Sequence, residues 1–141
     1  MILELKDGEL DTKVLTSTVG GCAVNTSRSA NFFLQSVGKR RRSVDFNERV
    51  MTIGAIGSDA QGLKVQSQLN RESVSFSVYK AENTMTGSCA VTVNNGDRTC
   101  IAILDACEKY PMSHMETVLN SESIKGTKIF YTTGFFLESS P

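Results

Sequence analysis

The segment VGGCAVNTSRSANFFL, residues 19–34, places two adjacent glycines directly before a helical pattern. Glycines suit a backbone that bends sharply or lets a ligand come close. Apolar residues then recur at intervals of three and four, which predicts a helix over about 23–36 with one face formed by Ala23, Ala30, Phe33, Leu34 and Val37. Asn25 falls in the first turn, near N–H groups that lack helical partners. Two interpretations stay open here: a site for a small polar ligand, or a tight turn with a capping side chain.

The composition is that of one modest globular domain. The chain has 141 residues, of which 40% are hydrophobic and 21% are charged. Lysine plus arginine equals aspartate plus glutamate, 15 each, so no net field favours nucleic acid and we expect no nucleic-acid partner. The basic cluster KRRR, residues 39–42, is interpreted as a solvated loop. No stretch approaches the ~20 apolar residues of a membrane helix, so no membrane partner is expected.

The cysteines and the histidine restrict the possible chemistry. Cys22, Cys89, Cys100 and Cys107 form no C-x-x-C pair. We therefore expect reduced thiols and a cytoplasmic protein, with the nucleus as an additional location. The single histidine, His114, excludes histidine-rich zinc sites, and its polar surroundings predict a surface position. No metal site is predicted in this chain.

Helical and strand patterns alternate along the chain, which predicts an α/β fold with a parallel sheet. The strands that cluster over 73–104 predict an antiparallel insertion or side sheet. In chain order, the predicted elements are strand 14–19, helix 23–36, loop 38–48, strand 49–57, helix 60–71, strands 73–80, 86–93 and 98–104, helix 112–121 and strand 128–136.

Several of these elements carry specific local signals. Asp59 is positioned to cap the helix over 60–71. In SVSFSVYK, residues 73–80, apolar residues alternate with serines, which is typical of a half-buried strand. The turn NNGD, residues 94–97, lies between two β-rich runs and predicts a hairpin. The helix over 112–121 is expected to turn four apolar residues inward: Met112, Met115, Val118 and Leu119.

Four stretches, taken in order, resemble the adenosine kinases of the ribokinase-like (pfkB carbohydrate kinase) family. GGCAVNTSRSA is similar to the signature G-G-x-x-x-N-x-x, and GAIGSDAQG to G-x-[IV]-G-x-D-x-x-G. TGSCAVTVNNGDRTCIAIL resembles T-G-T-C-A followed by G-x-R-S-L-I-A-N-L. YTTGFFLESSP resembles Y-x-x-G-F-F-L-x-x-S-P, the stretch most specific to adenosine kinases. The resemblance covers residues 19–141, nearly the whole chain.

The resemblance implies a fold. It is an α/β, ribokinase-like architecture in which a partial, mostly parallel central sheet carries flanking helices and a small antiparallel β lid over about 73–104. Residues 1–141 would form a single partial domain. The family's catalytic G-A-G-D motif does not occur in this sequence. The chain is therefore expected to be an N-terminal to middle fragment without the ATP-binding half.

The resemblance also implies a set of nucleoside contacts. In the family, the second glycine and the asparagine of the first signature approach the sugar hydroxyls, and lid residues lie near the purine and ribose. Cys22 stands where the family often has serine, and Cys100 where it often has leucine. Arg98 matches an arginine expected to face the transferred phosphoryl group. The implied substrate-binding residues are Gly20, Gly21, Cys22, Asn25, Cys89, Cys100, Ala102, Leu104 and Phe136.

The activity that the resemblance implies is phosphoryl transfer from magnesium ATP to the 5′-hydroxyl of adenosine, a purine-salvage reaction of a monomeric enzyme. ATP and Mg²⁺ are the implied cofactors, and the catalytic aspartate is expected outside this chain. Two alternatives remain: another sugar kinase of the family, such as a ribokinase, or a short non-catalytic protein that binds nucleoside or pairs with a full-length kinase. A half-sheet would expose an edge strand and apolar surface, so the isolated chain is expected to aggregate or to fold loosely.

Overall fold

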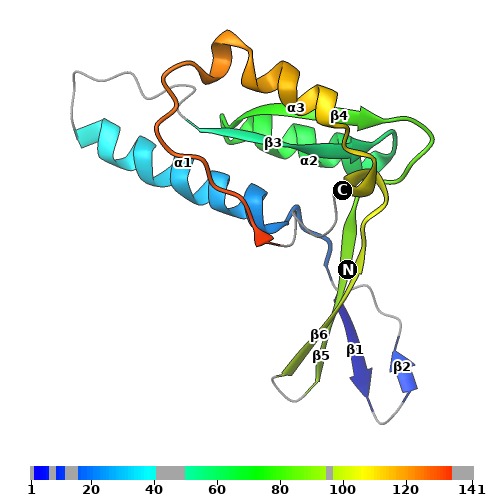
Figure 1. Cartoon of the computed structure of the whole chain (residues 1–141). Helices are drawn as coiled ribbons and strands as arrows, with labels where there is room; N and C mark the ends of the chain where they lie inside the picture. The colour runs from blue at the N-terminus through cyan, green and yellow to red at the C-terminus, as the bar shows by residue number, and fades with distance from the viewer. Residues whose placement is uncertain (1, 7–8, 12–15, 41–49, 95–96, 135–141) are drawn as a thin grey trace.

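The computed structural model describes residues 2–6, 9–11, 16–40, 50–94 and 97–134. Its elements, in chain order, are β1 (Ile2–Lys6), β2 (Glu9–Asp11), α1 (Cys22–Arg40), β3 (Met51–Gly57), α2 (Ala60–Arg71), β4 (Ser75–Ala81), β5 (Ser88–Asn94), β6 (Asp97–Ile103), the 3-10 helix η1 (Asp105–Lys109), α3 (Met112–Leu119) and the 3-10 helix η2 (Glu122–Ile124). Helices surround the two-stranded sheet β3–β4 and form a body with it (Figure 1). A second sheet, with strand order β2-β1-β5-β6, extends away from this body as a stalk. None of the described helices is long and apolar enough to cross a membrane.

The β3–β4 sheet is parallel, with a register that runs from Met51 opposite Ser75 to Gly57 opposite Ala81. Parallel neighbours need a crossover, and α2 with its 12 residues supplies it. The predicted strands at 49–57 and 73–80 and the helix at 60–71 are therefore confirmed. The grouping of 73–80 with an antiparallel side sheet is wrong, because β4 pairs with β3 in the body of the molecule.

Both faces of β4 are covered, which departs from the single buried face that its alternating sequence predicts. Residues 75–79 are all half-buried. The ring of Tyr79 packs edge-on against Tyr110 and His114, at centroid distances of 6.2 and 5.7 Å. Ser77 Oγ lies 3.5 Å from His114 Nε2. The serine face of the strand is thus covered by η1 and α3, and His114 is half-buried rather than a surface residue.

The helix α3 confirms the predicted helix at 112–121 but not its whole inward face. Val118 is buried and Met115 is half-buried. Met112 and Leu119, predicted to point inward, are 68% and 49% exposed. The helix has only eight residues, so it presents a narrow stripe to β4 and leaves its two ends outside that stripe.

The helix α1 begins at Cys22, as its double glycine predicts, and continues to Arg40, so the first residues of the predicted loop 38–48 are helical. Polar contacts attach it to the end of α2. The Arg28 guanidinium donates to both carboxylate oxygens of Glu72, at 2.6 and 2.7 Å. The Asn31 side chain, which is 3% exposed, donates to the Glu72 carbonyl at 2.8 Å. Phe33, which was predicted to share the apolar face, is 67% exposed.

Two predicted strands are wrong wherever the structure describes them. Residues 16–19 of the expected strand 14–19 are irregular, and their carbonyls meet side chains instead of a neighbouring strand: Lys64 Nζ donates to Ser17 O and Arg28 Nη1 to Val19 O. Residues 128–133 of the expected strand 128–136 have no strand partner among the described residues. A segment becomes a strand only when its backbone groups pair with a neighbour.

The predicted hairpin is confirmed by β5 and β6, which pair antiparallel from Ser88 opposite Ile103 to Asn94 opposite Asp97. On its other side, β5 pairs in parallel with β1, and β1 pairs antiparallel with β2. These first two strands were not predicted, because each is short and its apolar residues alternate with charged ones over only a few positions. With β1 and β2 beside it, the hairpin becomes part of a four-stranded mixed sheet.

Candidate functional site

The double glycine forms an open turn at the start of α1. Gly21 has a φ of 100°, a left-handed conformation that favours glycine. A side chain added at Gly20 or Gly21 would meet no atom within 4 Å. The backbone N–H of Asn25 donates to the Gly21 carbonyl at 2.9 Å, while the side chains of Cys22 and Asn25 are exposed. The turn therefore presents bare backbone and one amide side chain to the surroundings.

One face of the β5–β6 hairpin gathers four of the predicted site residues. Cys89 pairs with Ala102, Val91 with Cys100, and Val93 with Arg98. Residues that pair directly point to the same face, and that face recurs at every second residue. The register therefore places Cys89, Cys100, Ala102 and Arg98 on one common face, which we call the cysteine face. All four residues are exposed.

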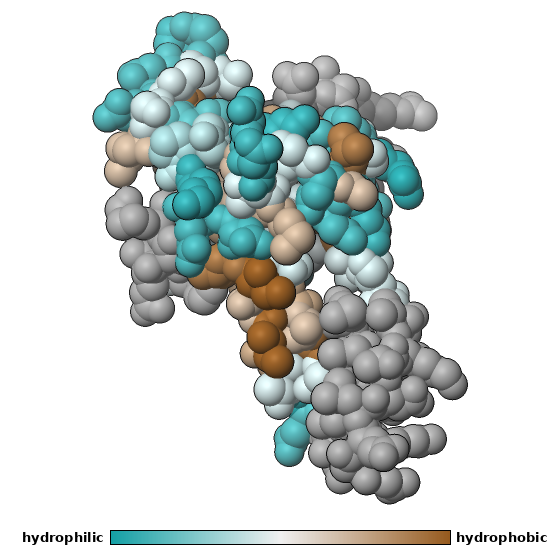
Figure 2. All heavy atoms as spheres, turned by 90° about the vertical axis from the view of Figure 1, so that its right-hand side faces the viewer, coloured by the Kyte–Doolittle hydropathy of each residue, from teal (hydrophilic) through white to brown (hydrophobic). Residues whose placement is uncertain are grey.

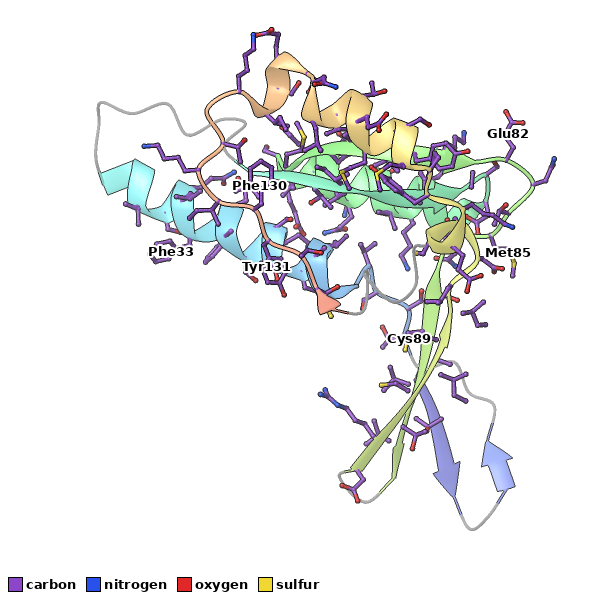
Figure 3. All side chains as sticks on the ribbon, in the orientation of Figure 1. Phe33, Glu82, Met85, Cys89, Phe130 and Tyr131 are labelled. Atoms are coloured by element: carbon purple, nitrogen blue, oxygen red, sulfur yellow. The ribbon has the colours of Figure 1, made fainter. Side chains whose placement is uncertain are left out.

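The remaining predicted site residues are only partly brought to this face. Leu104 follows β6 at the base of the stalk and is half-buried. Phe136 lies outside the described residues. In the view of Figure 3, Cys89 lies where the hairpin leaves the body, on the side toward the beginning of α1. Among the described residues, no hydrogen bond joins the Gly20–Asn25 turn to the hairpin.

The base of the hairpin is fixed by a buried hydrogen-bond network around Thr86, which is 7% exposed. Its hydroxyl donates to Asp59 Oδ1 at 2.5 Å and accepts from the Gly57 N–H at 3.0 Å. Its backbone N–H donates to Asp59 Oδ2 at 3.0 Å. The predicted cap is confirmed as well, because Asp59 Oδ1 accepts from the Gly62 N–H at 2.9 Å. Donation by the Thr86 hydroxyl, helped by the backbone N–H groups of Thr86 and Gly62, lowers the pKa of Asp59.

The glycines of two quoted motifs let the chain pass closely at this base. A Cβ on Gly57 would lie 2.1 Å from the Thr84 carbonyl oxygen. A Cβ on Gly87 would lie 2.7 Å from the Cys107 sulfur. The N–H of Ala106 donates to the Met85 carbonyl at 3.1 Å, which ties the two ends of the hairpin together. The sequence analysis did not predict this close packing at the base of the hairpin, although the glycines involved belong to the motifs GAIGSDAQG and TGSC.

An open hollow of about 550 Å³ lies at the carboxyl ends of β3 and β4, where open α/β sheets commonly bind ligands. It contains none of the predicted site residues. Its lining consists of Ser58, Asp59, Glu82, Asn83, Thr84 and Met85. Glu82 and Met85 lie at the outer edge of the body, away from Cys89 (Figure 3). Since the Asp59 carboxylate is already occupied by Thr86 and Gly62, we do not assign the ligand site to this hollow.

The described part of the chain contains no group of three or more His, Cys, Asp or Glu residues that could hold a metal ion. Its four cysteines are free thiols, as expected. Cys107 is half-buried, and burial raises the pKa of its thiol, with the carboxylates of Glu108 and Asp105 adding to the rise. The candidate site is therefore the glycine turn together with the cysteine face, two surfaces without a resident metal cluster.

The chain matches the pfkB family of carbohydrate kinases over residues 4–141, and it belongs to this family. Within the family it is similar to adenosine kinases. Adenosine kinase 2 and adenosine kinase 1 of Arabidopsis thaliana are 30% and 31% identical to it over 122 residues, which make up 86% of this chain. Those residues make up 32% and 33% of the two relatives, so the chain spans about a third of their length.

Solved structures show the same relationship. The Anopheles gambiae adenosine kinase in complex with P1,P4-di(adenosine-5) tetraphosphate aligns with a TM-score of 0.70 at 25% identity, over 86% of this chain and 33% of that one. The Schistosoma mansoni adenosine kinase in complex with 2-fluoroadenosine aligns with a TM-score of 0.76 at 21% identity, over 99% of this chain and 40% of that one. A ribokinase from Giardia lamblia aligns with a TM-score of 0.55 at 13% identity, over 84% of this chain and 34% of that one. The fold is ribokinase-like, and the resemblance to adenosine kinases is confirmed.

Proposed function

We propose that this chain forms the nucleoside-facing part of an adenosine kinase, which transfers a phosphoryl group from ATP to the 5′-hydroxyl of adenosine. The observation that carries the proposal is the cysteine face. It collects Cys89, Cys100, Ala102 and Arg98, the positions that the family resemblance assigns to the nucleoside and the phosphoryl group. The higher TM-scores of the adenosine kinases relative to the ribokinase favour a nucleoside over a free sugar.

In this proposal the glycine turn receives the ribose. The left-handed backbone at Gly21 and the empty space beside Gly20 leave room for a sugar to approach the main chain. The exposed Asn25 amide offers both a donor and an acceptor, which suits two neighbouring hydroxyl groups. The proposal therefore assigns sugar recognition to Gly20, Gly21 and Asn25, with Cys22 as a weak hydrogen-bonding neighbour.

The β5–β6 hairpin acts as the lid over the nucleoside. The Asp59–Thr86 network holds its base, while β6 is exposed along its whole length. A hairpin that is held at its base can move over a bound ligand. Closure of such an element excludes water, which would otherwise compete as the phosphoryl acceptor. Cys89, Cys100 and Ala102 would then contact the purine and ribose, with Leu104 at the base.

Arg98, which is exposed near the turn of the hairpin, is assigned to the phosphoryl group because a guanidinium donates well to phosphate oxygens. When bound, ATP supplies the transferred phosphoryl group, and Mg²⁺ neutralises its charge. The described residues do not fit a magnesium site, and the sequence has no G-A-G-D motif. The proposal therefore assigns ATP, Mg²⁺ and the catalytic aspartate to polypeptide beyond these 141 residues.

The first experiment measures the intact mass of the protein isolated from its source, together with its formation of AMP from adenosine and ATP. A mass more than twice 15.4 kDa, a G-A-G-D motif and AMP formation would support the proposal. A mature protein of 15.4 kDa without phosphoryl transfer would replace it with a non-catalytic binding role.

A competition titration between adenosine and ribose separates the proposal from a sugar-kinase function. We expect adenosine to displace ribose, and Asn25→Ala to weaken adenosine binding by about tenfold, the effect of one lost polar contact of ~1.4 kcal/mol. Asn70→Ala, at an exposed position on α2, is the matched control and should bind as the unmodified protein does. Preference for ribose would overturn the nucleoside assignment.

A further inference from the structure

Two cysteine thiols lie diagonally across the hairpin. Cys89 pairs with Ala102 and Cys100 with Val91, so the two cysteines are separated by one cross-strand position on the same face. Diagonal neighbours of this kind lie roughly 7–8 Å apart along the backbone, with their side chains closer. The pairing with β1 covers only Val91, Thr92 and Val93, so at Cys89 the strand β5 pairs with β6 alone. Two-stranded ribbons of this kind twist more strongly than broad sheets, which brings one of the two diagonals nearer.

The Cys89 thiol donates to the Ala90 carbonyl at 3.8 Å, and the Cys100 thiol affects its pKa. Partial loss of water raises the pKa of Cys89, and the charge and hydrogen bonding of the Cys100 thiol add to the rise. Both residues are exposed and free. The other two cysteines lie elsewhere: Cys22 begins α1, and Cys107 is half-buried behind Gly87 at the base of the stalk. The hairpin therefore carries an isolated, accessible pair of thiols.

We propose that Cys89 and Cys100 are a modification site, a cross-strand dithiol that hydrogen peroxide converts reversibly to an intramolecular disulfide. One thiolate sulfur attacks a peroxide oxygen, so that an S–O bond forms, the O–O bond breaks, and the other oxygen leaves as hydroxide, which is protonated to water. The second thiolate then attacks that sulfur and displaces a second water, so two thiols and one peroxide give one disulfide and two waters. A dithiol reductant restores the pair. The inference rests on the register of this hairpin and is independent of the proposed kinase function.

The hairpin can accommodate the bridge. Disulfides usually join Cα atoms about 4.4–6.8 Å apart, so a diagonal pair at roughly 7–8 Å closes only if added strand twist brings the two backbones about 1 Å nearer. All seven residues of β6 are exposed, and no packed core opposes such a change on that strand. The bridge would fix the two strands relative to each other and replace two thiols on the cysteine face by one apolar disulfide. The modification therefore alters the shape of the same surface that carries Ala102 and Arg98.

Non-reducing peptide mapping of the folded full chain tests the proposal. After treatment with hydrogen peroxide and alkylation of the remaining thiols, trypsin cleaves after Lys80, Arg98 and Lys109, which separates Cys89 from Cys100. We expect peptides 81–98 and 99–109 to appear joined, an intact mass lower by about 2 Da before alkylation, and reversal by dithiothreitol. Fragmentation of the joined peptides distinguishes Cys100 from Cys107.

Matched variants and a denatured control complete the test. Cys100→Ser should abolish the joined peptides, whereas Cys22→Ser, at another exposed cysteine, should leave them unchanged. In denaturant the same bridge should form about tenfold more slowly, because the hairpin no longer holds the thiols together. A bridge to Cys22 or Cys107, links between molecules, or oxidation of single thiols without a bridge would overturn the proposal.

Discussion

The base of the hairpin and its blade, by which we mean the strands β5 and β6, are built in opposite ways. At the base, Thr86 is buried and forms hydrogen bonds with Asp59 and Gly57. A Cβ added at Gly57 would collide with the backbone of residues 84–86. In the blade, every residue of β6 is exposed, including Arg98, Cys100 and Ala102 of the cysteine face, and so is Cys89 on β5. Rigid scaffolds commonly hold exposed binding segments in this way. The residues that determine shape are therefore separate from those proposed to contact the substrate.

The apolar surface shows the same division. Figure 2 shows hydrophobic side chains gathered along the stalk below a largely polar body. On the hairpin, Ile101 and Ile103 are 59% and 47% exposed. On the body, a second exposed apolar set comes from α1 and the segment after η2, and includes Phe33, Phe130 and Tyr131 (Figure 3). Exposed apolar patches typically mark surfaces that meet other polypeptide, which is consistent with the expected aggregation of the isolated chain.

The largest effect is expected from Gly57→Ala at the base. The added Cβ would lie 2.1 Å from the Thr84 carbonyl oxygen and 2.7 Å from the Thr86 nitrogen, both backbone atoms that cannot rotate away. We expect a loss of about 3 kcal/mol in the free energy of unfolding, or failure to fold. Urea titration followed by circular dichroism measures the loss.

Gly54→Ala is the matched control, since it lies in the same strand and its Cβ would meet nothing within 4 Å. That variant should stay within about 1 kcal/mol of the unmodified chain. Equal losses in the two variants would show that the crowding at the base does not determine stability.

A smaller loss is expected from Thr86→Val, which keeps the shape of the side chain but removes the hydroxyl. Asp59 then loses its main donor and the Gly57 N–H loses its acceptor, so we expect a cost of about 1–3 kcal/mol. Thr92→Val, in the half-buried middle of β5, is the control and should cost much less. Comparable losses at the two threonines would contradict the special role of the base.

The same network predicts a pH dependence. The pKa of Asp59 is lower in the folded chain than in the unfolded chain, so its contribution is complete above the unfolded value, about 4, and is lost as the pH falls through the lowered folded value. Thr86→Val should flatten this acid loss without abolishing it, because Glu72 also has a lowered pKa, mainly through Arg28. Unfolding free energies measured between neutral and strongly acidic pH test both statements. An unchanged acid profile in the variant would refute the assignment to Asp59.

The ion pair between α1 and α2 should have a more modest effect. Arg28 meets Glu72 with two hydrogen bonds, but both side chains are about a third exposed and are therefore screened by water. Arg28→Lys keeps the charge and loses the two-pronged geometry, so we expect a cost of about 1 kcal/mol and a higher pKa of Glu72. Arg71→Lys, at an exposed position nearby, should change neither quantity. Urea titration and an NMR titration of the Glu72 carboxyl provide the measurements.

Local patterns predicted the elements that depend mainly on their own residues. The helix α2 has its predicted bounds because Asp59 caps it and its turns need no distant partner. The hairpin was predicted for the same reason, since a turn between two β-rich runs brings adjacent segments together. Its register then follows, which is why four site residues suggested by family resemblance fall on one face.

Elements that depend on distant partners were predicted less well. Residues 128–133 have a strand-like composition but no neighbouring strand among the described residues. The orientation of β4 depends on the crossover through α2, and the alternation of its residues does not reveal it. The Asp59–Thr86 bonds join positions 27 residues apart, so no local pattern could show why both motifs contain their particular glycines.

The smallest effect on stability, and a clear effect on solubility, is expected from Ile101→Thr on the blade. Ile101 is 59% exposed and lies opposite Ala90, so little buried contact is lost, and threonine retains a strong strand preference. We expect the free energy of unfolding to change by less than about 0.5 kcal/mol. Light scattering as a function of concentration should fall, because the apolar strip of an exposed edge strand is interrupted. Thr99→Ile, on the same face of β6, extends that strip and should raise the scattering. If Phe33→Ser on α1 lowers the scattering and Ile101→Thr does not, the body surface and not the blade drives association.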